Sequence, residues 1–466
     1  MNKTLLFFML SAGFMMSCQA AESLDANDAK AREIFARIIA YKTEVGQGQV
    51  PEMARYLASQ FKAAGFPDAD IHIVPFQDTA SLVVRYRGDG TGGRPIAVMA
   101  HMDVVTAKPE DWVRDPFTLI EENGFFYGRG TLDIKSGVAS LTATFLRMKS
   151  EGFVPSRDLI IVFSGDEETN QFTTVDLVKN HRDLVDVEYA LNSDSGGGTL
   201  DESGKAQVYG LQTAEKTFAS FELTARNPGG HSSLPRADNA IYDLADALKK
   251  VQGYHFPVQW NDTTLAFFKI AGAQTQGDIG AAMSRFANDP HDKAASDVLA
   301  NSPADVGRIM TTCVATLLRG GHAENALPQS ATATINCRIF PGVPVADVGK
   351  TLQDLVGPAV TVTVMGQPMF SDPSPLRPDI LAAVTKAVHA RYPGVSIAPM
   401  QESGASDGLV FRAAGMPTYG VGETFIKNSD VFSHGLNERS PVVSFYEGLD
   451  QWYGLLKDLA GPVTKP

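Results

Sequence analysis

The sequence lacks three features that would assign it to particular protein classes. No internal apolar run is long enough to span a bilayer, which excludes a membrane span in the mature chain. The 40 Lys and Arg residues are outnumbered by 53 Asp and Glu residues, giving a net charge of -13 at pH 7. Because clustered basic residues supply most nucleic-acid affinity, we expect no nucleic-acid partner. The chain also has no internal repeat and no low-complexity tract, so repeat architectures are excluded.

Cysteine is scarce as well, with three residues in 466. Cys313 and Cys337 are the two internal cysteines. An oxidising compartment would permit them to pair, and two unrelated buried thiols fit the sequence equally well.

The N-terminus has the order of a secretory signal. Lys3 is followed by an apolar run over residues 5–16 and then by small residues, which predicts a signal peptide over residues 1–21. The pattern slightly favours ordinary cleavage over the alternative, a lipoprotein signal in which Cys18 carries the lipid anchor. We therefore expect an exported protein, periplasmic or secreted.

Short β-branched runs and amphipathic segments predict an α/β fold. Residues 29–64 carry apolar side chains at helical spacing and predict two helices. The predicted strands that follow span residues 71–76, 82–86, 96–100, 159–164 and 188–192. Two of these runs are continuously apolar, as expected for central strands covered by helices on both faces.

The pattern changes after Glu215 and indicates a second, inserted domain. Strands over 217–225, 313–319, 331–340 and 360–364 and helices over 238–250 and 346–355 follow the order of a ferredoxin-like split unit. We expect a catalytic domain built from residues 22–214 and 371–466, with a ferredoxin-like α+β domain over residues 215–370 inserted between them. A long segment, about residues 254–303, predicts additional helices that shape a pocket or interface.

Acidic and imidazole side chains follow the ends of three predicted strands. His101 and Asp103 follow residues 96–100, Glu167 and Glu168 follow residues 159–164, and Asp194 follows residues 188–192. Ligands of open α/β sheets bind at the carboxyl ends of strands, so these side chains should share one crevice.

Each of these side chains also has an ordinary structural interpretation when taken singly. His101 could be a hydrogen-bonded surface residue, the two glutamates could begin a helix, and Asp194 could open a turn. Several carboxylates in one place repel each other unless a cation offsets them, and mixed His and carboxylate ligands suit zinc. The cluster therefore predicts a metal site.

Six segments in order resemble the co-catalytic zinc metallopeptidase family of aminoacylase, glutamate carboxypeptidase and the carnosine-type dipeptidases. The segments are HMDVV (101–105), GRGTLDIK (128–135), SGDEE (164–168), NSDSG (192–196), NPGGHSS (227–233) and SHGLNE (433–438). The resemblance covers nearly the whole mature chain. It implies a mixed, mostly parallel catalytic sheet and an inserted domain that serves as lid and dimerisation unit.

The resemblance also implies five metal ligands and two Zn²⁺ ions per subunit. Asp133 would bridge the ions, one of which would also bind His101 and Asp194. The other would bind Glu168 and His434. The donor set also suits Co²⁺ or Mn²⁺. In this family the peptide bond after the bridging residue, here Asp133-Ile134, is cis.

Three further residues take catalytic roles by the same resemblance. Glu167 would be the general base. It would accept a proton from a water molecule activated by zinc and pass that proton to the leaving amine. Asp103 would accept the second N–H of His101. His231 would reach across a homodimer interface to polarise the scissile carbonyl in the partner subunit, with a loop residue as its ordinary alternative.

Asn325, Arg338 and Gly404 resemble residues that contact substrate. Arg338 suits a carboxylate, although a salt bridge within the inserted domain is nearly as well supported. Gly404 would offer a backbone N–H, with a turn as the alternative.

The sequence predicts hydrolysis of an amide bond in a small peptide, most simply by a dipeptidase or aminopeptidase. Asp194 favours this choice, because many acylase and carboxypeptidase relatives carry Glu there. The alternatives are a carboxypeptidase or an N-acyl-amino-acid amidohydrolase of the aminoacylase kind and, more remotely, a non-catalytic binding protein on the same fold.

Overall fold

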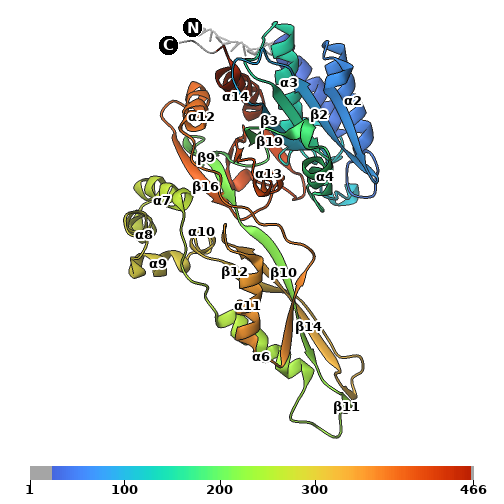
Figure 1. Ribbon diagram of the computed structural model, residues 1–466, viewed down its shortest axis with the longest axis vertical. Coiled ribbons are helices and arrows are strands. Elements are labelled where there is room, and N and C mark those ends of the chain that lie inside the picture. The colour runs from blue at the N-terminus through green and yellow to red at the C-terminus, as the bar shows by residue number, and fades with distance from the viewer. Residues whose placement is uncertain (1–23, 463–466) are drawn as a thin grey trace, which may run out of the picture.

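The computed structural model describes residues 24–462, and the predicted signal peptide and Cys18 lie outside them. In the described part of the chain, ten strands form one mixed sheet in the order β1-β2-β6-β3-β7-β17-β9-β8-β18, with β16 also paired to β9 (Figure 1). The strands are β1 (Ile71–Phe76), β2 (Thr79–Tyr86), β3 (Ile96–His101), β6 (Leu159–Ser164), β7 (Tyr189–Asn192), β8 (Gly197–Leu200), β9 (Ala206–Glu215), β16 (Ser396–Glu402), β17 (Thr418–Gly420) and β18 (Phe425–Lys427).

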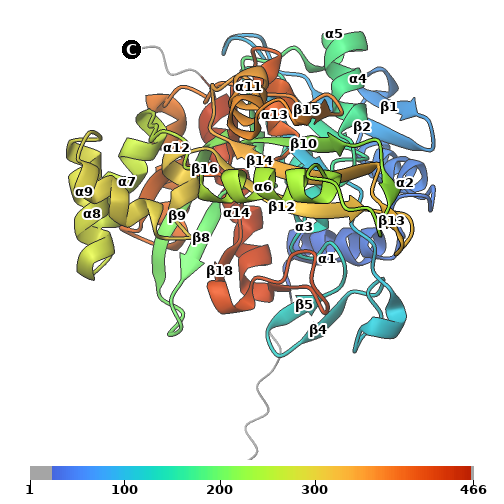
Figure 2. The same cartoon turned by 90° about the horizontal axis from the view of Figure 1, so that it is seen from below.

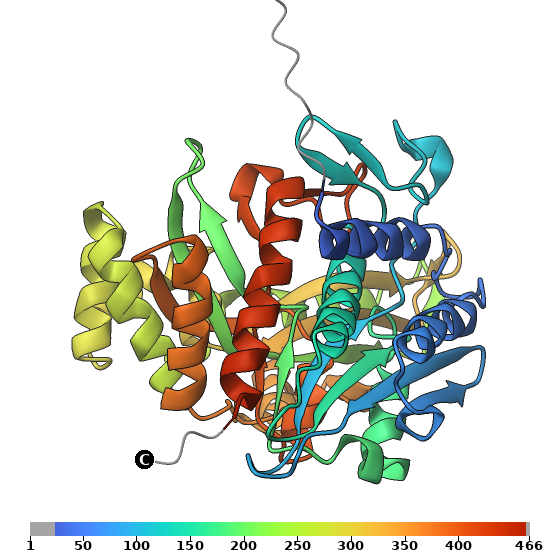
Figure 3. The same cartoon turned by 90° about the horizontal axis from the view of Figure 1, so that it is seen from above.

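Helices cover both faces of this sheet, as the continuously apolar strands predicted. The larger core packs one sheet face against α1 (Ala26–Ile39), α2 (Val50–Ala63), α3 (Lys135–Ser150), α12 (Pro378–Arg391) and α14 (Val442–Ala460), which lie side by side in Figure 3. The other face packs against α4 (Phe172–Asn180), α5 (Arg182–Val185) and α13 (Gly408–Ala413). Along β3, Val98 faces the first core and Met99 the second, because successive side chains of a strand point to opposite faces.

The central strands run in the same direction. β3 pairs in parallel with β6 and with β7, and β7 pairs in parallel with β17. Their carboxyl ends therefore meet at one edge of the sheet, where the polar side chains after each strand come together.

A second, four-stranded antiparallel sheet has the order β12-β14-β10-β15. It comprises β10 (Thr217–Arg226), β12 (Thr312–Gly320), β14 (Ser330–Ile339) and β15 (Val360–Met365), with α6 (Ala240–Gly253) and α11 (Val345–Val356) packed against it. This is the strand order of a split βαβ unit. Cys313 and Cys337 are directly opposite on β12 and β14 and form a disulfide, which resolves the alternative that the sequence left open.

The segment that had no clear period folds into helices beside the main sheet. It contains α7 (Asp262–Gln274), α8 (Gly277–Asn288) and α9 (Lys293–Ala300), followed by α10 (Val306–Ile309). These helices enclose a separate apolar cluster, and α7 packs against β16, as Figure 1 shows. Asn261 caps α7 through its side chain, and its amide contacts Gln401 of β16 at 3.4 Å.

Two short sheets complete the described structure. One contains β4 (Ile120–Glu122), β5 (Phe125–Tyr127) and β19 (Arg439–Pro441), and the other contains β11 (Gly230–His231) and β13 (Ala326–Leu327). Single 3-10 turns span Asp68–Asp70, Pro109–Asp111 and Asn428–Asp430. None of the helices described is both long and apolar enough to cross a membrane.

Candidate active site

The five predicted metal ligands converge at the carboxyl edge of the central strands. His101 is the last residue of β3, Glu168 lies in the turn after β6, and Asp194 lies two residues beyond β7. Asp133 stands two residues before α3, and the Asp133-Ile134 peptide bond is cis, as the resemblance predicted. His434 comes from the loop before β19.

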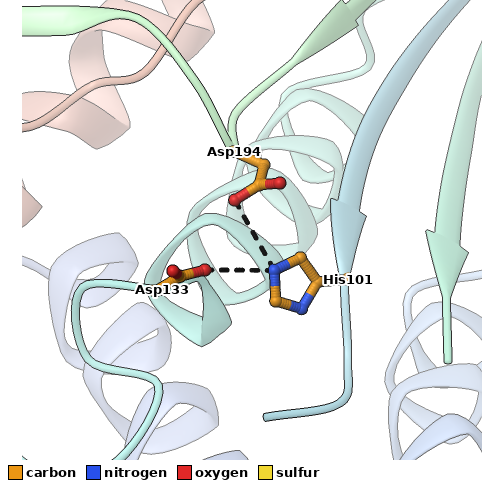
Figure 4. A group of neighbouring side chains, drawn as sticks. All are labelled: His101, Asp133 and Asp194. Atoms are coloured by element: carbon orange, nitrogen blue, oxygen red, sulfur yellow. Dashed lines mark hydrogen bonds and ion pairs between the residues drawn. The ribbon is translucent and has the colours of Figure 1, made fainter. Parts of the chain in front are cut away.

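Two groups of side chains share Asp133. In the first, His101 Nε2 lies 3.1 Å from Asp133 Oδ1 and 3.5 Å from Asp194 Oδ1 (Figure 4). In the second, His434 Nε2 lies 3.1 Å from Asp133 Oδ2 and 2.9 Å from Glu168 Oε1. Within each group the candidate ligand atoms all lie within 4.8 Å of one another. Asp133 therefore presents one carboxylate oxygen to each group, which is the arrangement of a bridging ligand.

The electrostatics of these groups fit a pair of cations. Burial opposes a charge on His101, yet Asp194 and Asp133 together raise its pKa well above the ordinary value. Hydrogen bonds to Asp133 and Glu168 raise the pKa of His434 to about 10. The carboxylates thus favour the protonated, positively charged form of both imidazoles. A divalent metal bound by His and carboxylate ligands would supply the positive charge in place of these protons.

Asp194 strengthens this conclusion. Burial raises the pKa of Asp194 to about 8, and the neighbouring Asp133 adds to the rise. Burial opposes ionisation of Asp133 as well, but hydrogen bonds from His101 and His434 hold its pKa below the ordinary value. Two carboxylates this close ionise together only when cations offset them, so the donor set fits two metal ions.

Glu167 lies beside the two groups and belongs to neither. Burial raises its pKa well above the ordinary value, and the charge of Asp194 raises it further. Its Oε1 accepts a hydrogen bond of 2.9 Å from the side-chain amide of Gln171. A carboxyl group with a raised pKa is suited to accepting a proton from water and returning it to a leaving group.

Asp103 makes a different contact from the one predicted. His101 Nδ1 lies 3.0 Å from the backbone carbonyl oxygen of Asp103 and 3.6 Å from its carboxylate, so the carbonyl is the acceptor within hydrogen-bond distance. The carboxylate instead accepts the backbone N–H groups of Glu167 at 3.1 Å and Glu168 at 3.0 Å. Asp103 therefore holds the turn that carries both glutamates.

Sequence reasoning missed a buried ion pair that supports the site. Arg129 and Glu438 are 2% and 0% exposed and form an ion pair beneath the ligands. Glu438 accepts the backbone N–H groups of Leu132 at 2.8 Å and Asp133 at 3.1 Å, and Arg129 donates to the carbonyl of His434 at 3.3 Å. Both residues stand in segments that carry the family resemblance, so a charged residue inside such a segment was the available signal.

Arg338 and Gly404 line a cavity of about 660 Å³ next to the second metal group. Glu167, Glu168 and His434 line the same cavity. Arg338 donates to the carbonyl of Ser403 at 2.8 Å, and its guanidinium carbon lies 4.7 Å from the ring centre of Phe218. The other guanidinium N–H groups of Arg338 are available to a ligand in the cavity, and carboxylate binding by Arg338 stays a prediction.

Comparison with known families decides the classification. Residues 97–458, most of the chain, match the family described as Peptidase family M20/M25/M40. The chain belongs to this family.

Relatives and solved structures of similar fold differ in activity. The N-fatty-acyl-amino acid synthase/hydrolase PM20D1 of Xenopus tropicalis is 28% identical over 355 residues, which cover 74% of this chain and 68% of the relative. The M20 family metallo-carboxypeptidase Sso-CP2 of Sulfolobus solfataricus has a TM-score of 0.70 at 16% identity, covering 92% of this chain and 99% of the other. The dipeptidase Dug1p of Saccharomyces cerevisiae has a TM-score of 0.68 at 18% identity, covering 94% and 98%. The family and fold thus agree, and this M20/M25/M40 member is a metal-dependent enzyme that acts on amide bonds.

Two predicted residues of this M20/M25/M40 member lie away from its metal ligands. His231 is the last residue of β11 and Asn325 directly precedes β13, and both are exposed. Figure 1 shows β11 at the far end of the second sheet. They are neighbours there, since Ser232 donates its backbone N–H to the Asn325 carbonyl at 3.0 Å. Ser233 Oγ lies 2.7 Å from His231 Nδ1. Within one chain, neither residue is brought to the metal groups.

Proposed function

We propose that the protein is an exported di-zinc hydrolase that cleaves small peptides and acts as a dipeptidase or aminopeptidase. The observation that carries this proposal is the pair of ligand groups sharing Asp133, with Glu167 beside them. The ligands would be His101 and Asp194 for one ion and Glu168 and His434 for the other.

The bound ions would lower the pKa of a water molecule and polarise the amide carbonyl. Glu167 then takes the proton of that water and delivers it to the leaving amine, a role that suits its raised pKa. Arg338 binds the carboxylate of the amino acid that leaves, and Gly404 lines the same cavity. Asp103 holds the turn that carries Glu167 and Glu168, because its carboxylate accepts their backbone N–H groups.

A homodimer through the second sheet would complete the site. Strand β12 is an edge strand, and α6 lies next to it in Figure 2. The side chains of Val314, Leu317 and Leu318 on β12 and of Tyr242 on α6 are exposed. An unpaired edge with exposed apolar side chains is a template for pairing with another chain. The exposed tip with His231 and Asn325 would then reach the partner subunit's substrate.

The disulfide supports export. Cys313 and Cys337 are bonded across β12 and β14. Disulfides persist in the periplasm and outside the cell and are rare in the cytosol. Expression with and without residues 1–21, followed by fractionation, tests this part of the proposal. A cytosolic full-length protein with free thiols would contradict it.

A substrate panel with Zn²⁺ tests the choice of substrate. Free dipeptides, N-acetylated amino acids and N-terminally blocked peptides are compared by kcat/KM under the same conditions. We expect free dipeptides to be cleaved fastest. Faster cleavage of blocked substrates would replace the dipeptidase by the second candidate.

That second candidate is an N-acyl-amino-acid amidohydrolase or carboxypeptidase. It is favoured by the likeness to the Xenopus N-fatty-acyl-amino acid synthase/hydrolase and to the Sulfolobus metallo-carboxypeptidase. Both candidates use the same metal groups and Arg338, so the group on the acyl side of the scissile bond distinguishes them.

Glu167→Gln separates proton transfer from metal binding. We expect kcat to fall by about 10³-fold or more, because the amide cannot act as a base, while the zinc content stays near about two per chain. Glu168→Gln is the matched control next to it, since Glu168 contacts His434 in the second ligand group. It should lower the metal content. Retained activity in Glu167→Gln would remove Glu167 from the reaction.

A further inference from the structure

A second cavity, whose lining does not include Arg338, adjoins the metal groups. Its volume is about 540 Å³, and both Asp133 and Asp194 line it. The cavity is also lined by Phe267 of α7 and Arg308 of α10, which belong to the helical segment beside the main sheet, and by Met400 of β16. These helices therefore form part of a pocket wall at the reaction centre.

Arg308 has unused hydrogen-bonding capacity at this wall. Its guanidinium carbon lies 4.1 Å from the ring centre of Phe267. One terminal nitrogen donates to the carbonyl of Gln401 at a long 3.4 Å, and Nε lies 3.8 Å from Asp305, beyond hydrogen-bond distance. The other oxygen of Asp305 accepts the Ser302 hydroxyl at 2.7 Å. Among the described residues, the buried Nε has no hydrogen-bond partner.

A half-buried guanidinium in a cavity wall, with few protein partners, favours an anionic ligand. An Arg fork binds a carboxylate through two parallel hydrogen bonds, and the contact with the Phe267 ring limits where the guanidinium can lie. Burial also lowers the pKa of Arg308, as expected for a charge removed from water. A carboxylate in the cavity would accept hydrogen bonds from the terminal guanidinium nitrogens, one of which has only the long contact with the Gln401 carbonyl.

The same cavity is also lined by the carboxyl group of Glu402, which can affect how an anionic ligand binds. Glu402 accepts the backbone N–H of Gly196 at 3.3 Å. Glu402 follows Gln401 on β16, and Arg308 of α10 donates to the Gln401 carbonyl, so the guanidinium lies beside the end of the strand that carries Glu402. Glu402 suits an amino group, while Arg308 suits a carboxylate.

The two cavities are lined by different metal ligands, Asp133 and Asp194 in one and Glu168 and His434 in the other, and could divide the substrate between them. Glu167, the proposed proton donor to the leaving amine, lines the Arg338 cavity, which therefore takes the leaving amino acid. The cavity beside Asp133 and Asp194 then takes the acyl part. This assignment rests on the proposed function.

We propose that Arg308, packed against Phe267, is a specificity-determining residue that selects substrates with a carboxylate on the acyl side of the scissile bond. Two kinds of acyl part have that chemistry. One is an N-terminal Glu or Asp residue with a free amine, and the other is a dicarboxylic acyl group without one.

The experiment compares acidic and neutral substrates in pairs with the zinc-loaded enzyme. Glu-Leu is paired with Gln-Leu, and N-glutaryl-leucine is paired with N-valeryl-leucine. We expect Arg308→Gln to lower the acidic-to-neutral ratio of kcat/KM tenfold or more in at least one pair, with neutral substrates changed by less than about twofold. The pair that responds identifies the source of the carboxylate. Arg308→Lys should recover part of the preference.

Matched controls separate this effect from a loss of structure. Arg285→Gln removes an arginine from the same helices, where Arg285 pairs with Asp292 at the surface, and should leave the ratio unchanged. Arg338→Gln should weaken acidic and neutral substrates alike. All variants are compared by thermal melting. A ratio that falls less than tenfold in both pairs of Arg308→Gln overturns the proposal, as does an equal loss for acidic and neutral substrates.

A binding measurement keeps this inference distinct from the proposed function. Glutarate should raise the melting temperature of the wild-type protein and of Arg338→Gln, and should fail to raise that of Arg308→Gln. If no peptide or N-acyl substrate is cleaved, the proposed function fails while the glutarate result still decides the role of Arg308. If substrates are cleaved and glutarate stabilises all variants equally, Arg308 has no such role.

Discussion

Glu402 illustrates how burial of one residue sets a pH dependence. Burial and the nearby Glu215 raise the pKa of Glu402 from 4.5 to about 7. The folded pKa lies above the unfolded one, so the folded protein holds a proton that the unfolded chain releases between these values. The contribution of Glu402 to stability is therefore most favourable below about pH 4.5 and is lost as the pH rises through 7.

Glu402→Gln should remove this loss. Its amide oxygen can still accept the Gly196 N–H, and no charge is buried at high pH. We expect the free energy of unfolding at pH 8.5 to rise by on the order of 3 kcal/mol, with little change near pH 4.5. Urea unfolding at both pH values measures it, with Glu110→Gln at an exposed position as the control. An equal effect at both pH values would contradict the explanation.

Asp133 and Asp194 should differ in their effect on metal content. Asp133 offers one oxygen to each ligand group, whereas Asp194 belongs to one. We expect Asp133→Asn to reduce the zinc content to well below one ion per chain and Asp194→Asn to leave about one. Metal analysis after dialysis distinguishes them. Equal losses in the two variants would show that Asp133 does not bridge.

At the scale of elements, the central strands of the main sheet were easier to predict from the sequence than strand β16. The apolar runs of β3 and β6 were recognised because a strand covered on both faces needs no polar residue along its length. Strand β16 was not predicted. It pairs with β9, nearly 190 residues earlier, and its side chains alternate too weakly to indicate a strand without that partner.

The disulfide between β12 and β14 is expected to stabilise the second sheet. Closing a loop between residues 24 positions apart reduces the entropy of the unfolded chain. Replacing both Cys313 and Cys337 by Ser should lower the free energy of unfolding by about 2–4 kcal/mol. Urea unfolding measures this loss. Reductant should destabilise the wild-type protein and leave the double variant unchanged, and insensitivity of the wild type would contradict the prediction.

The placement of His231 belongs to the scale of the whole molecule. Its exposed position far from the metal ligands leaves no role within one chain, yet a twofold dimer through β12 and α6 would bring it to the partner. Two inactive variants, Glu167→Gln and His231→Ala, can therefore be mixed after mild unfolding.

In the mixed dimer, one site has an intact Glu167 and receives an intact His231 from the partner. Random pairing makes half of the dimers mixed, so about a quarter of wild-type activity should return. Size-exclusion chromatography confirms the mixing. If His231 acts within its own chain, no activity returns, and if His231→Ala alone is fully active the residue has no role.

The amino-acid sequence by itself determined the fold class, the order of the ligand-bearing segments and the identity of the acidic and imidazole side chains. Burial periodicity is local, and strands that run in parallel bring their ends together, so residues such as His101 and Asp194 could be grouped before any coordinates. His434 was recognised only through its resemblance to a family, because its loop is not part of a periodic element.

Only the tertiary structure decided contacts between segments distant in the chain. In the folded chain the Asp103 carboxylate accepts the backbone N–H groups of Glu167 and Glu168, and Arg129 forms an ion pair with Glu438. Cys313 is bonded to Cys337. Arg308 lines a cavity beside Asp133. Each of these contacts depends on how whole elements pack, and neither spacing nor composition specifies packing.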